Sequence, residues 1–219
     1  MVQSDCGVIF DMDGVLVDSY DAHLESWRRL AAELRQSLTD DQIGSTFGRT
    51  SRDIIRLLFA VHDDASIKRL DARKESLYRD LVRGKVPAMP GAVEFVKSCH
   101  AAGMKLAVGS SGPAENVQLV CHELEIGSLL NAVVTGDDIT HGKPDPEVFL
   151  TAAARLGLKP QKCVVIEDAP VGVEAARRAG MRCVGLIGTY SRETLSAASL
   201  VIAAFSELDA GQVVRLLKT

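Results

Sequence analysis

The sequence has no marked excess of either charge, few aromatic residues and no hydrophobic run long enough to cross a membrane. Its 25 Lys and Arg residues oppose 29 Asp and Glu residues, which gives a formal net charge of −4. Such a balance predicts no basic surface for nucleic acid or anionic lipid. A membrane-spanning helix needs about 20 consecutive apolar residues, and no apolar stretch of this sequence approaches that length. We therefore expect neither a nucleic-acid partner nor a membrane partner.

Cysteine usage and the N-terminal sequence both predict a reduced, cytoplasmic protein. The five cysteines are odd in number and scattered, without a Cys-x-x-Cys pair, and the five histidines are dispersed as well. No group of these residues has the spacing of a zinc site. Free, mostly buried thiols are expected. Residues 1–5 lack the basic start and apolar block of an export signal.

The sequence divides into two unlike parts. In 1–17 and 85–219, apolar runs of strand length alternate with helical patterns, which is typical of parallel strands joined by crossover helices. The runs are continuous because helices are expected to cover both faces of the sheet. Residues 18–84 contain only helical patterns, and a segment rich in Pro and Gly follows them. We predict an α/β protein whose doubly wound, Rossmann-like parallel-sheet core, 1–17 and 85–219, contains an inserted all-helical cap domain, 18–84.

The patterns predict the individual elements as well. The expected strands are 6–10, 104–108, 131–135, 163–166, 183–187 and 200–203. The expected helices are one that starts near Asp18, and 51–62, 64–83, 91–102, 114–124, 146–156, 170–179 and 206–217.

The first apolar run ends in two carboxylates, Asp11 and Asp13, followed by Gly14. Side chains alternate along a strand, so both acids can emerge on the same side of the backbone. Two crowded acids repel each other, and either a bound divalent cation or a shared proton would justify the arrangement. Both explanations indicate an active site.

Further polar residues follow other strands of the predicted sheet. Ser110 and Ser111 come after the second run, Glu167 and Asp168 end the fourth, and Lys143 precedes a helix in the loop between them. In an open parallel sheet, ligands bind beyond the carboxyl ends of the strands. The carboxylates suit Mg²⁺, a hard cation that prefers oxygen ligands. The ammonium and hydroxyls suit a phosphate. A free aspartate beside both indicates phosphoryl transfer through an aspartyl-phosphate.

The chemistry assigns a role to each residue. Asp11 would be the nucleophile and a metal ligand, and Asp13 would protonate the leaving alkoxide and then activate water. Lys143 and the metal would offset the repulsion between a carboxylate and a phosphate ester. The remaining assignments are Asp168 and Glu167 for the metal, and Ser110, Ser111 and Lys143 for the phosphate oxygens.

Four ordered stretches resemble the motifs of the haloacid dehalogenase (HAD) superfamily, and the resemblance covers essentially the whole chain. They are Phe-Asp-Met-Asp-Gly-Val-Leu-Val-Asp-Ser, the Gly-Ser-Ser turn, Gly-Lys-Pro-Asp-Pro-Glu-Val-Phe and Ile-Glu-Asp-Ala-Pro-Val-Gly-Val-Glu-Ala-Ala. The helical insertion is similar to the small cap of the subfamily that contains β-phosphoglucomutase and sugar-phosphate phosphatases. The resemblance also implies that the backbone carbonyl of Asp13 is a metal ligand.

The same resemblance implies which cap residues contact the substrate. His23 lies in a segment similar to one where a mutase histidine communicates substrate binding to the acid/base aspartate. Lys74 belongs to an Arg-Lys-x-x-x-Tyr element that supplies the cap lysine of those mutases. Arg49 and Arg52 lie in a stretch that resembles their substrate-specificity loop. However, Phe47 stands where those mutases often have a lysine, which weighs against a mutase.

Three of these residues also have ordinary structural interpretations. Asp168, together with Glu167, precedes a helix and could cap it. Lys74 lies in a helix rich in charges, where a solvated face is the default. His23 lies one turn before Trp27 and could pack against it.

These observations predict a Mg²⁺-dependent phosphatase that hydrolyses a small phosphorylated metabolite, such as a sugar phosphate, through an aspartyl-phosphate. The alternative is a phosphohexomutase similar to β-phosphoglucomutase, which would return the phosphoryl group to a sugar hydroxyl. A catalytically idle phosphometabolite-binding protein is a third possibility, although every catalytic residue type is present. A dehalogenase is disfavoured because those relatives lack the second aspartate. We expect a monomer.

Overall fold

In the computed structural model of the chain, residues 5–46 and 49–218 are described. The chain divides into two compact units, Met1–Asp18 with Pro87–Thr219, and Ser19–Val86. We call the first unit the core and the second the cap. That each is an independent domain, with the division expected from the sequence, stays a prediction.

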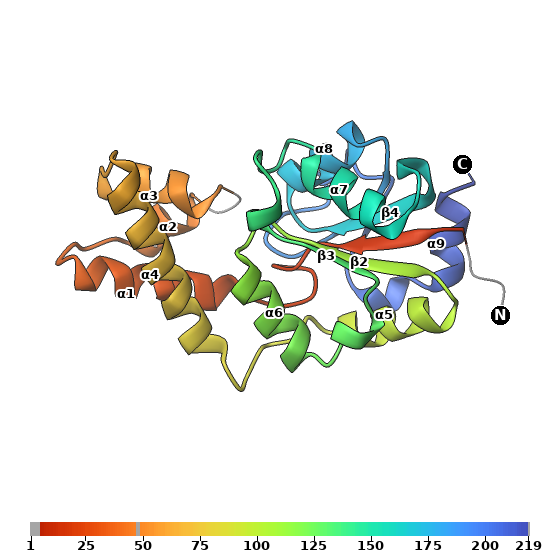
Figure 1. The fold of residues 1–219 in the computed structure, drawn as a ribbon, viewed down its shortest axis with the longest axis horizontal. Coiled ribbons are helices and arrows are strands. Elements are labelled where there is room, and N and C mark those ends of the chain that lie inside the picture. Colours follow the sequence, from red (N-terminus) through yellow and green to blue (C-terminus); the bar gives the residue numbers. More distant parts are fainter. Residues whose placement is uncertain (1–4, 47–48, 219) are drawn as a thin grey trace. The chain divides into compact units, whose positions relative to one another are not determined.

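The core is built on one parallel sheet of six strands in the order β3-β2-β1-β4-β5-β6 (Figure 1). The strands are β1 Gly7–Phe10, β2 Lys105–Gly109, β3 Ala132–Val134, β4 Cys163–Glu167, β5 Arg182–Leu186 and β6 Leu200–Ile202. This order is that of a doubly wound sheet, so the predicted fold class is confirmed. From β1 the chain adds strands first on one side of the sheet and then, starting with β4, on the other. The carboxyl ends of β1 and β4 therefore mark the expected position of a ligand site.

Helices cover both faces of the sheet, which explains why its strands are apolar along their whole length. The core helices are α5 Ala92–Ala101, α6 Ala114–Glu123, α7 Glu147–Leu156, α8 Pro170–Arg178 and α9 Ala210–Leu216. Helices α7 and α8 pack on one face, where Phe149 and Val173 join Ile9 in a buried cluster. On the other face the Phe95 ring contacts those of Phe10 and Phe205, at centroid distances of 6.0 and 5.3 Å.

The last helix begins later than the expected 206–217. A 3₁₀ turn, Phe205–Glu207, comes first. The helix α9 then starts at Ala210 because Asp209 accepts a hydrogen bond from the backbone N–H of Gln212, whose side chain accepts in return from Asp209. This reciprocal cap fixes the start of the helix.

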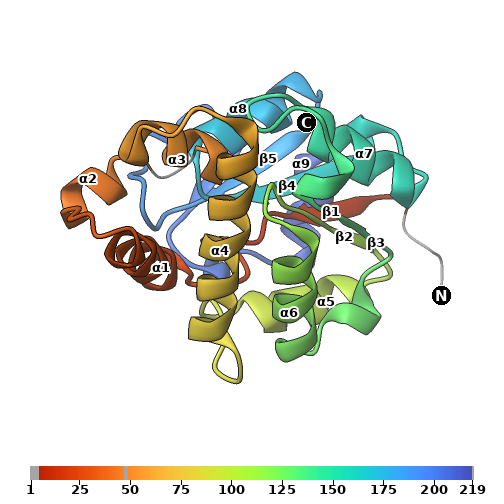
Figure 2. The same cartoon turned by 60° about the vertical axis from the view of Figure 1, so that its left-hand side comes forward.

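Every regular element in the described part of the cap is a helix, as Figure 2 shows from a second direction. The helices are α1 Tyr20–Glu33, α2 Asp40–Gly44, α3 Ser51–Phe59 and α4 Asp64–Val82. Their apolar faces meet in a cluster around Trp27, Ile55 and Leu70. The short helix α2 was not predicted, because five residues are too few to show a helical period, although Thr39 and Gln42 form a capping box there.

The two chain segments that lead into and out of the cap are hydrogen-bonded to each other within the core. Val17 and Ala88 form an antiparallel bridge. The backbone N–H of Asp18 donates to Pro87 O at 2.8 Å, and that of Met89 donates to Leu16 O at 3.0 Å. The insertion therefore starts and ends at one place on the core.

All five cysteines are free and buried, as expected. Burial raises the pKa of the Cys99 thiol to about 12, with a further contribution from Cys6. Burial also raises the pKa of the Cys121 and Cys163 thiols to about 11. In addition, no helix in the described ranges is long and apolar enough to cross a membrane.

We predict that the buried thiols of Cys99, Cys121 and Cys163 react slowly with Ellman's reagent in the native protein. At about pH 8 a thiol whose pKa is about three units higher is ionised in about one molecule in a thousand, and only the thiolate attacks the reagent. Absorbance should show less than about one equivalent released in the first minutes from native protein, and five equivalents after unfolding in urea, one for each cysteine. Rapid release of several equivalents from native protein would contradict the burial of these thiols.

Candidate active site

The register of the sheet places Asp11 beside Glu167. Phe10, the last residue of β1, pairs with Ile166 of β4 and with Val108 of β2. The backbone N–H of Asp11 continues the ladder by donating to Ile166 O at 3.0 Å. Because the next residue along β4 is Glu167, the two acids end adjacent strands at the same edge of the sheet.

Gly14 allows the chain to turn away directly beside Asp168. Its φ is 73°, in the left-handed region that favours glycine. A Cβ atom at this position would lie 2.1 Å from Oδ2 of Asp168, which no substituted residue could accept without displacing the carboxylate. The Asp-Gly step of the first motif therefore has a steric reason in addition to a conformational one.

Lys143 lies between two of the acids. Its Nζ is 2.7 Å from Oδ1 of Asp11 and 2.6 Å from Oε1 of Glu167. The Lys143 side chain is 8% exposed and that of Glu167 is 0% exposed, so the ion pairs are shielded from water. The ammonium also lies 5.1 Å from the centre of the Phe149 ring, a cation–π contact. The sequence did not single out Phe149, although it belongs to the third motif.

Both carboxylate oxygens of Glu167 have a hydrogen-bond partner. Its Oε2 accepts a hydrogen bond of 2.7 Å from the backbone N–H of Ala169, while its other oxygen faces Lys143. Ala169 is the N-cap residue of α8, and no side chain at that position makes a capping hydrogen bond. Of the pair Glu167-Asp168 that could cap this helix, Asp168 does not hold the N-cap position, which Ala169 occupies, whereas Glu167 accepts the N–H of that residue.

Crowded carboxylates set the electrostatics of the site. Burial raises the pKa of Asp11 to about 7 although Lys143 opposes it, and the charges of Glu167 and Asp13 raise it further. Burial, followed by repulsion from Glu167 and Asp11, raises the pKa of Asp168 well above its ordinary value. Burial alone would lower the pKa of Lys143, but the charges of Asp11 and Glu167 reverse the direction and raise it. The lysine therefore stays charged and the acids compete for neutralisation.

A divalent cation fits this group of acids. Asp11, Glu167 and Asp168 each offer an oxygen, and these oxygens lie within 4.8 Å of one another. When all three carboxylates are ionised, the one ammonium leaves two negative charges uncompensated, and oxygen donors of this kind are those that Mg²⁺ prefers. The side chain of Asp13 is outside that group, so its predicted part as a metal ligand depends on its backbone carbonyl. The ligand assignments themselves stay predictions.

The loop after β2 contains the two predicted phosphate-binding serines. Ser110 is buried, and its backbone N–H donates to Val134 O at 3.0 Å. Its Oγ accepts a hydrogen bond of 3.0 Å from the backbone N–H of Gly112, whereas Ser111 is exposed. A Cβ atom on Gly112 would lie 3.6 Å from Cε of Met12, which places this loop next to the Asp11–Asp13 segment.

A second loop, after β3, braces the serine loop. The backbone N–H of Gly136 donates to Gly112 O at 2.7 Å, and the approach is so close that a Cβ on Gly136 would lie 2.5 Å from Ser111 O. Asp137 caps α6 from this loop by accepting a hydrogen bond from the backbone N–H of Ala114 at 3.0 Å. No local sequence signal joins these residues, because they lie about twenty positions apart.

In the cap, the structure brings together two of the four predicted substrate residues. Nζ of Lys74 lies 2.8 Å from Nδ1 of His23, and Lys74 is only 2% exposed. Arg49 and Arg52 are exposed. Of the stretch that resembles a specificity loop, residues 47 and 48 lie outside the described residues.

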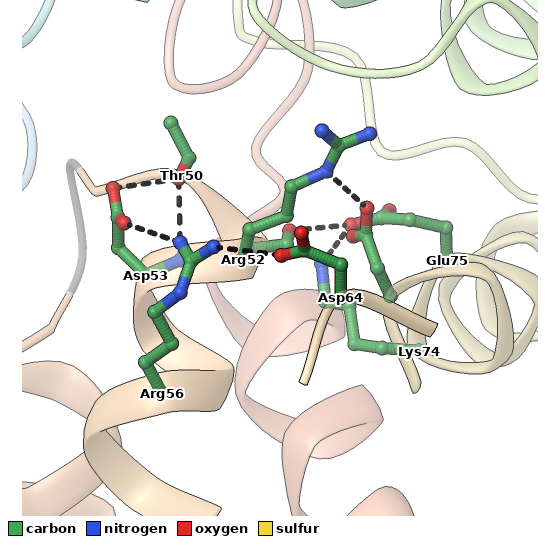
Figure 3. A network of polar contacts seen from close by, with 9 residues as sticks. Thr50, Arg52, Asp53, Arg56, Asp64, Lys74 and Glu75 are labelled. Carbon is green, nitrogen blue, oxygen red and sulfur yellow. Dashed lines mark hydrogen bonds and ion pairs between the residues drawn. The ribbon is translucent and has the colours of Figure 1, made fainter. Parts of the chain in front are cut away.

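The environment of Lys74 differs from the solvated face that a charge-rich helix suggests. Lys74 lies four residues after Leu70 and three residues before Leu77, so all three side chains share one face of α4. This face is buried. Its neighbour Glu75 is buried as well and pairs with it at 2.9 Å (Figure 3). Sequence reasoning missed Glu75, although the apolar spacing around Lys74 could have indicated a buried pair.

Comparison with known proteins agrees with this geometry. The family model of haloacid dehalogenase-like hydrolases matches residues 8–186. A phosphorylated carbohydrates phosphatase of Thermotoga maritima is 35% identical over 179 residues, which cover 80% of this chain and 81% of the relative. A β-phosphoglucomutase of Bacillus subtilis is 29% identical over 188 residues, or 82% of each chain. The crystal structure of β-phosphoglucomutase from Clostridium difficile matches with a TM-score of 0.84 at 24% identity, covering 100% of this chain and 98% of that one.

A parallel sheet with an acid cluster and a lysine at its switch point defines a class of phosphate-handling hydrolases. The chain belongs to the haloacid dehalogenase-like hydrolase family. The resemblance found in its motifs is thus confirmed, and at 24% identity the structural match to the C. difficile protein shows the common fold alone.

We predict that Gly172→Ala destabilises the protein in spite of its helical position. In an exposed helix interior, alanine would be favoured over glycine by about 1 kcal/mol. Here a Cβ atom would lie 1.7 Å from Oε1 of the buried Glu167, so the carboxylate has to move and its pairing with Lys143 is lost. Urea unfolding should show a loss of about 2 kcal/mol or more.

The matched control is Gly188→Ala, because no atom lies within 4 Å of a Cβ built there. Its unfolding free energy should change by less than about 0.5 kcal/mol. Equal stability of the two variants would show that Glu167 is not held as the structure has it.

We also predict that Mg²⁺ stabilises the protein more at about pH 8 than at about pH 5. The pKa of Asp11 is raised from 3.8 to about 7 in the folded protein, so the folded state binds a proton more tightly than the unfolded state. That contribution to stability is complete below the ordinary pKa and is lost as the pH rises through about 7. At the higher pH the Asp11 carboxylate is ionised and can bind Mg²⁺, whereas at the lower pH protons compete with Mg²⁺ for it.

After treatment with EDTA, millimolar Mg²⁺ should raise Tm by about 5 °C at the higher pH and by less than half of that at the lower. The variant Asp64→Asn, whose carboxylate is 97% exposed, should respond like the wild type. An equal rise at both pH values would count against proton–metal competition at these acids.

Proposed function

We propose that this protein is a Mg²⁺-dependent phosphatase that hydrolyses a small phosphorylated metabolite, such as a sugar phosphate, through an aspartyl-phosphate. The observation that supports it most directly is the position of Lys143, whose ammonium lies 2.7 Å from Asp11 within the acid cluster. A charged, buried lysine beside a nucleophilic carboxylate is what a reaction between two anions requires. The similarity to a phosphorylated carbohydrates phosphatase supports the same class of substrate.

In the first half-reaction, an oxygen of Asp11 attacks phosphorus and the bond from phosphorus to the ester oxygen breaks. Asp13 gives its proton to the departing alkoxide, so the alcohol leaves neutral. In the second half-reaction, Asp13 takes a proton from water, which attacks phosphorus and releases inorganic phosphate and free Asp11. Bound Mg²⁺ would screen the negative charge of the phosphate and favour the ionised form of Asp11.

The other core residues orient the phosphate. Lys143 holds one oxygen of Asp11 while Glu167 fixes the lysine from the opposite side. The Ser110 hydroxyl already accepts from Gly112 but keeps its proton as a donor to a phosphate oxygen. The backbone N–H groups around Ser111 supply further donors. Asp168, with Asp11 and Glu167, would hold the metal.

The cap residues His23, Lys74, Arg49 and Arg52 are proposed to contact the part of the substrate that is remote from the phosphate. The partner is thus a small phosphorylated molecule. We further propose that the protein acts as a monomer in the cytoplasm, because neither the site nor the composition requires a second subunit, nucleic acid or a lipid surface.

A phosphohexomutase is the alternative. It is favoured by the contact between Lys74 and His23 at 2.8 Å, since both belong to stretches that resemble the mutase cap, and by the similarity to the β-phosphoglucomutase of B. subtilis. It would use the same Asp11 chemistry. A catalytically idle binding protein has less support, because it gives no reason for the pairing of Lys143 with Asp11.

The test is release of inorganic phosphate from a panel of sugar and polyol phosphates with and without Mg²⁺. We expect Mg²⁺-dependent release by the wild type, and a loss of at least about 10³-fold in Asp11→Asn, because an amide cannot form the acyl-phosphate. Asp64→Asn, with its exposed carboxylate, should keep wild-type activity. Equal activity of Asp11→Asn and the wild type would refute the mechanism.

The same experiment separates the two enzymes. With β-glucose 1-phosphate and a trace of the corresponding bisphosphate, a mutase makes glucose 6-phosphate without net release of phosphate. If no ester is turned over and Asp11→Asn binds phosphorylated ligands as the wild type does, the protein is the idle binding protein.

A further inference from the structure

The carboxylate of Asp138 ties together the 3₁₀ turn that follows β3, Gly136–Asp138. Its Oδ2 accepts hydrogen bonds from the backbone N–H and from the hydroxyl of Thr135, each at 2.9 Å. Its Oδ1 lies 2.5 Å from Nη2 of Arg155, which belongs to the last turn of α7. The other terminal nitrogen of this guanidinium donates to the backbone oxygen of Val133 in β3. Asp138 thus joins the turn both to the end of β3 and to a helix that covers the sheet.

The ion pair of Asp138 and Arg155 acts locally. Hydrogen bonds from Arg155 and from the backbone of Thr135 lower the pKa of Asp138 to about 2, so the carboxylate is ionised at neutral pH. The side chains of Arg155 and Asp138 are 41% and 29% exposed, and an ion pair this open to water adds little to the stability of a whole protein. Its effect is therefore to fix the conformation of the turn.

The turn held by Asp138 is bonded to the serine loop, which we define as residues 110–113. The backbone N–H of Gly136 donates to Gly112 O at 2.7 Å, and the N–H of Gly112 donates to Oγ of Ser110 at 3.0 Å. The peptide groups of Gly112 are thus held from two directions. A Cβ atom on Gly136 would lie 2.5 Å from Ser111 O, so the two segments are in close contact and a shift of the turn has to move the serine loop.

The orientation of the Ser110 hydroxyl depends on this contact. The residue is 1% exposed, so its surroundings are protein and not bulk water. The hydrogen bond that its oxygen accepts from Gly112 leaves the hydroxyl proton as a donor. Since that bond occupies one lone-pair direction of the oxygen, it also limits the directions in which the proton can point.

On the basis of the proposed function, in which the Ser110 hydroxyl donates to a phosphate oxygen, we propose that Asp138 is a positioning residue for phosphate binding. Asp138 fixes the turn after β3, the turn fixes Gly112, and Gly112 orients the hydroxyl. The neighbouring Asp137 attaches the same turn to the far end of the serine loop, because its carboxylate accepts from the backbone N–H of Ala114 at 3.0 Å.

This role predicts a particular kinetic signature. A hydrogen bond from Ser110 to a charged phosphate oxygen is one of the stronger kinds in proteins. It forms with the phosphate of the bound substrate as well as with that of the transition state. A misplaced hydroxyl therefore weakens binding and leaves the turnover of bound substrate nearly unchanged.

The test compares the wild type with Asp138→Ala by calorimetric titration with inorganic phosphate at saturating Mg²⁺. We expect the Kd of phosphate to rise about fivefold or more. In hydrolysis of p-nitrophenyl phosphate, KM should rise by a similar factor while kcat changes by less than about threefold. A lower kcat with unchanged Kd and KM would overturn the proposal.

The background of Ser110→Ala tests whether Asp138 acts through this hydroxyl. Once the hydroxyl is absent, adding Asp138→Ala should raise the Kd of phosphate by less than about twofold. An increase as large as the one seen in the presence of Ser110 would show a general disturbance of the core and refute the proposed route.

The matched control is Asp209→Ala, which also removes the carboxylate of a capping box, at the start of α9, with an arginine 3.8 Å away. Asp209 follows β6, and β6 and β3 are the two opposite edges of the sheet. Its Kd should stay within about twofold of the wild type.

A second variant covers the case in which Asp138→Ala fails to fold, as judged by its thermal melt. Arg155→Met keeps an aliphatic side chain of similar length and leaves the bonds between Asp138 and Thr135 in place. It should raise the Kd of phosphate about threefold or more, and a folded Arg155→Met with the wild-type Kd would refute the proposal.

The outcomes separate this proposal from the proposed function. If phosphate binds but neither p-nitrophenyl phosphate nor any ester of the panel is hydrolysed, the proposed function fails, and the Kd values still decide the role of Asp138. If esters are hydrolysed and Asp138→Ala binds phosphate as the wild type does, the role of Asp138 is refuted while the phosphatase stands.

Discussion

The ammonium of Lys143, held between Asp11 and Glu167 with both N···O distances below 3 Å, is the interaction on which the rest of the site depends. Without it, three buried carboxylates at one edge of the sheet would face one another without a counter-charge, at a cost of several kcal/mol. With it, two negative charges remain, which suits a divalent cation. The same acids leave no room for a side chain at Gly14 or Gly172. A Cβ atom on Gly14 would collide with Asp168, and one on Gly172 would collide with Glu167.

The doubly wound parallel sheet, and the gathering of polar residues at its strand ends, could be predicted because each depends on a pattern that is continuous in the sequence. Apolar strands with polar residues at their ends lie in register, so Asp11 and Glu167 are neighbours as soon as β1 and β4 are. The helix α2 escaped prediction because five residues are too few to show a helical period, and the late start of α9 did so because a local capping box decides it. The capping of α6 by Asp137 and the contact of Phe149 with Lys143 join residues whose proximity only the folded chain reveals.

The cap could be predicted less well, because its polar residues are defined by partners and not by motifs. Lys74 was expected from a resemblance, yet its burial follows from its place in an apolar stripe of α4. Glu75, which lies 2.9 Å from Lys74, had no sequence signal of its own apart from that neighbour.

The backbone bridge between Val17 and Ala88 has an architectural consequence. Because the segments entering and leaving the insertion are already joined as a narrow stem, a two- or three-residue hairpin of the kind found in proteins could close the stem in place of the whole cap. All six strands, and the residues that follow their ends, belong to the chain segments on either side of this stem, so a change of the inserted segment leaves their sequence untouched.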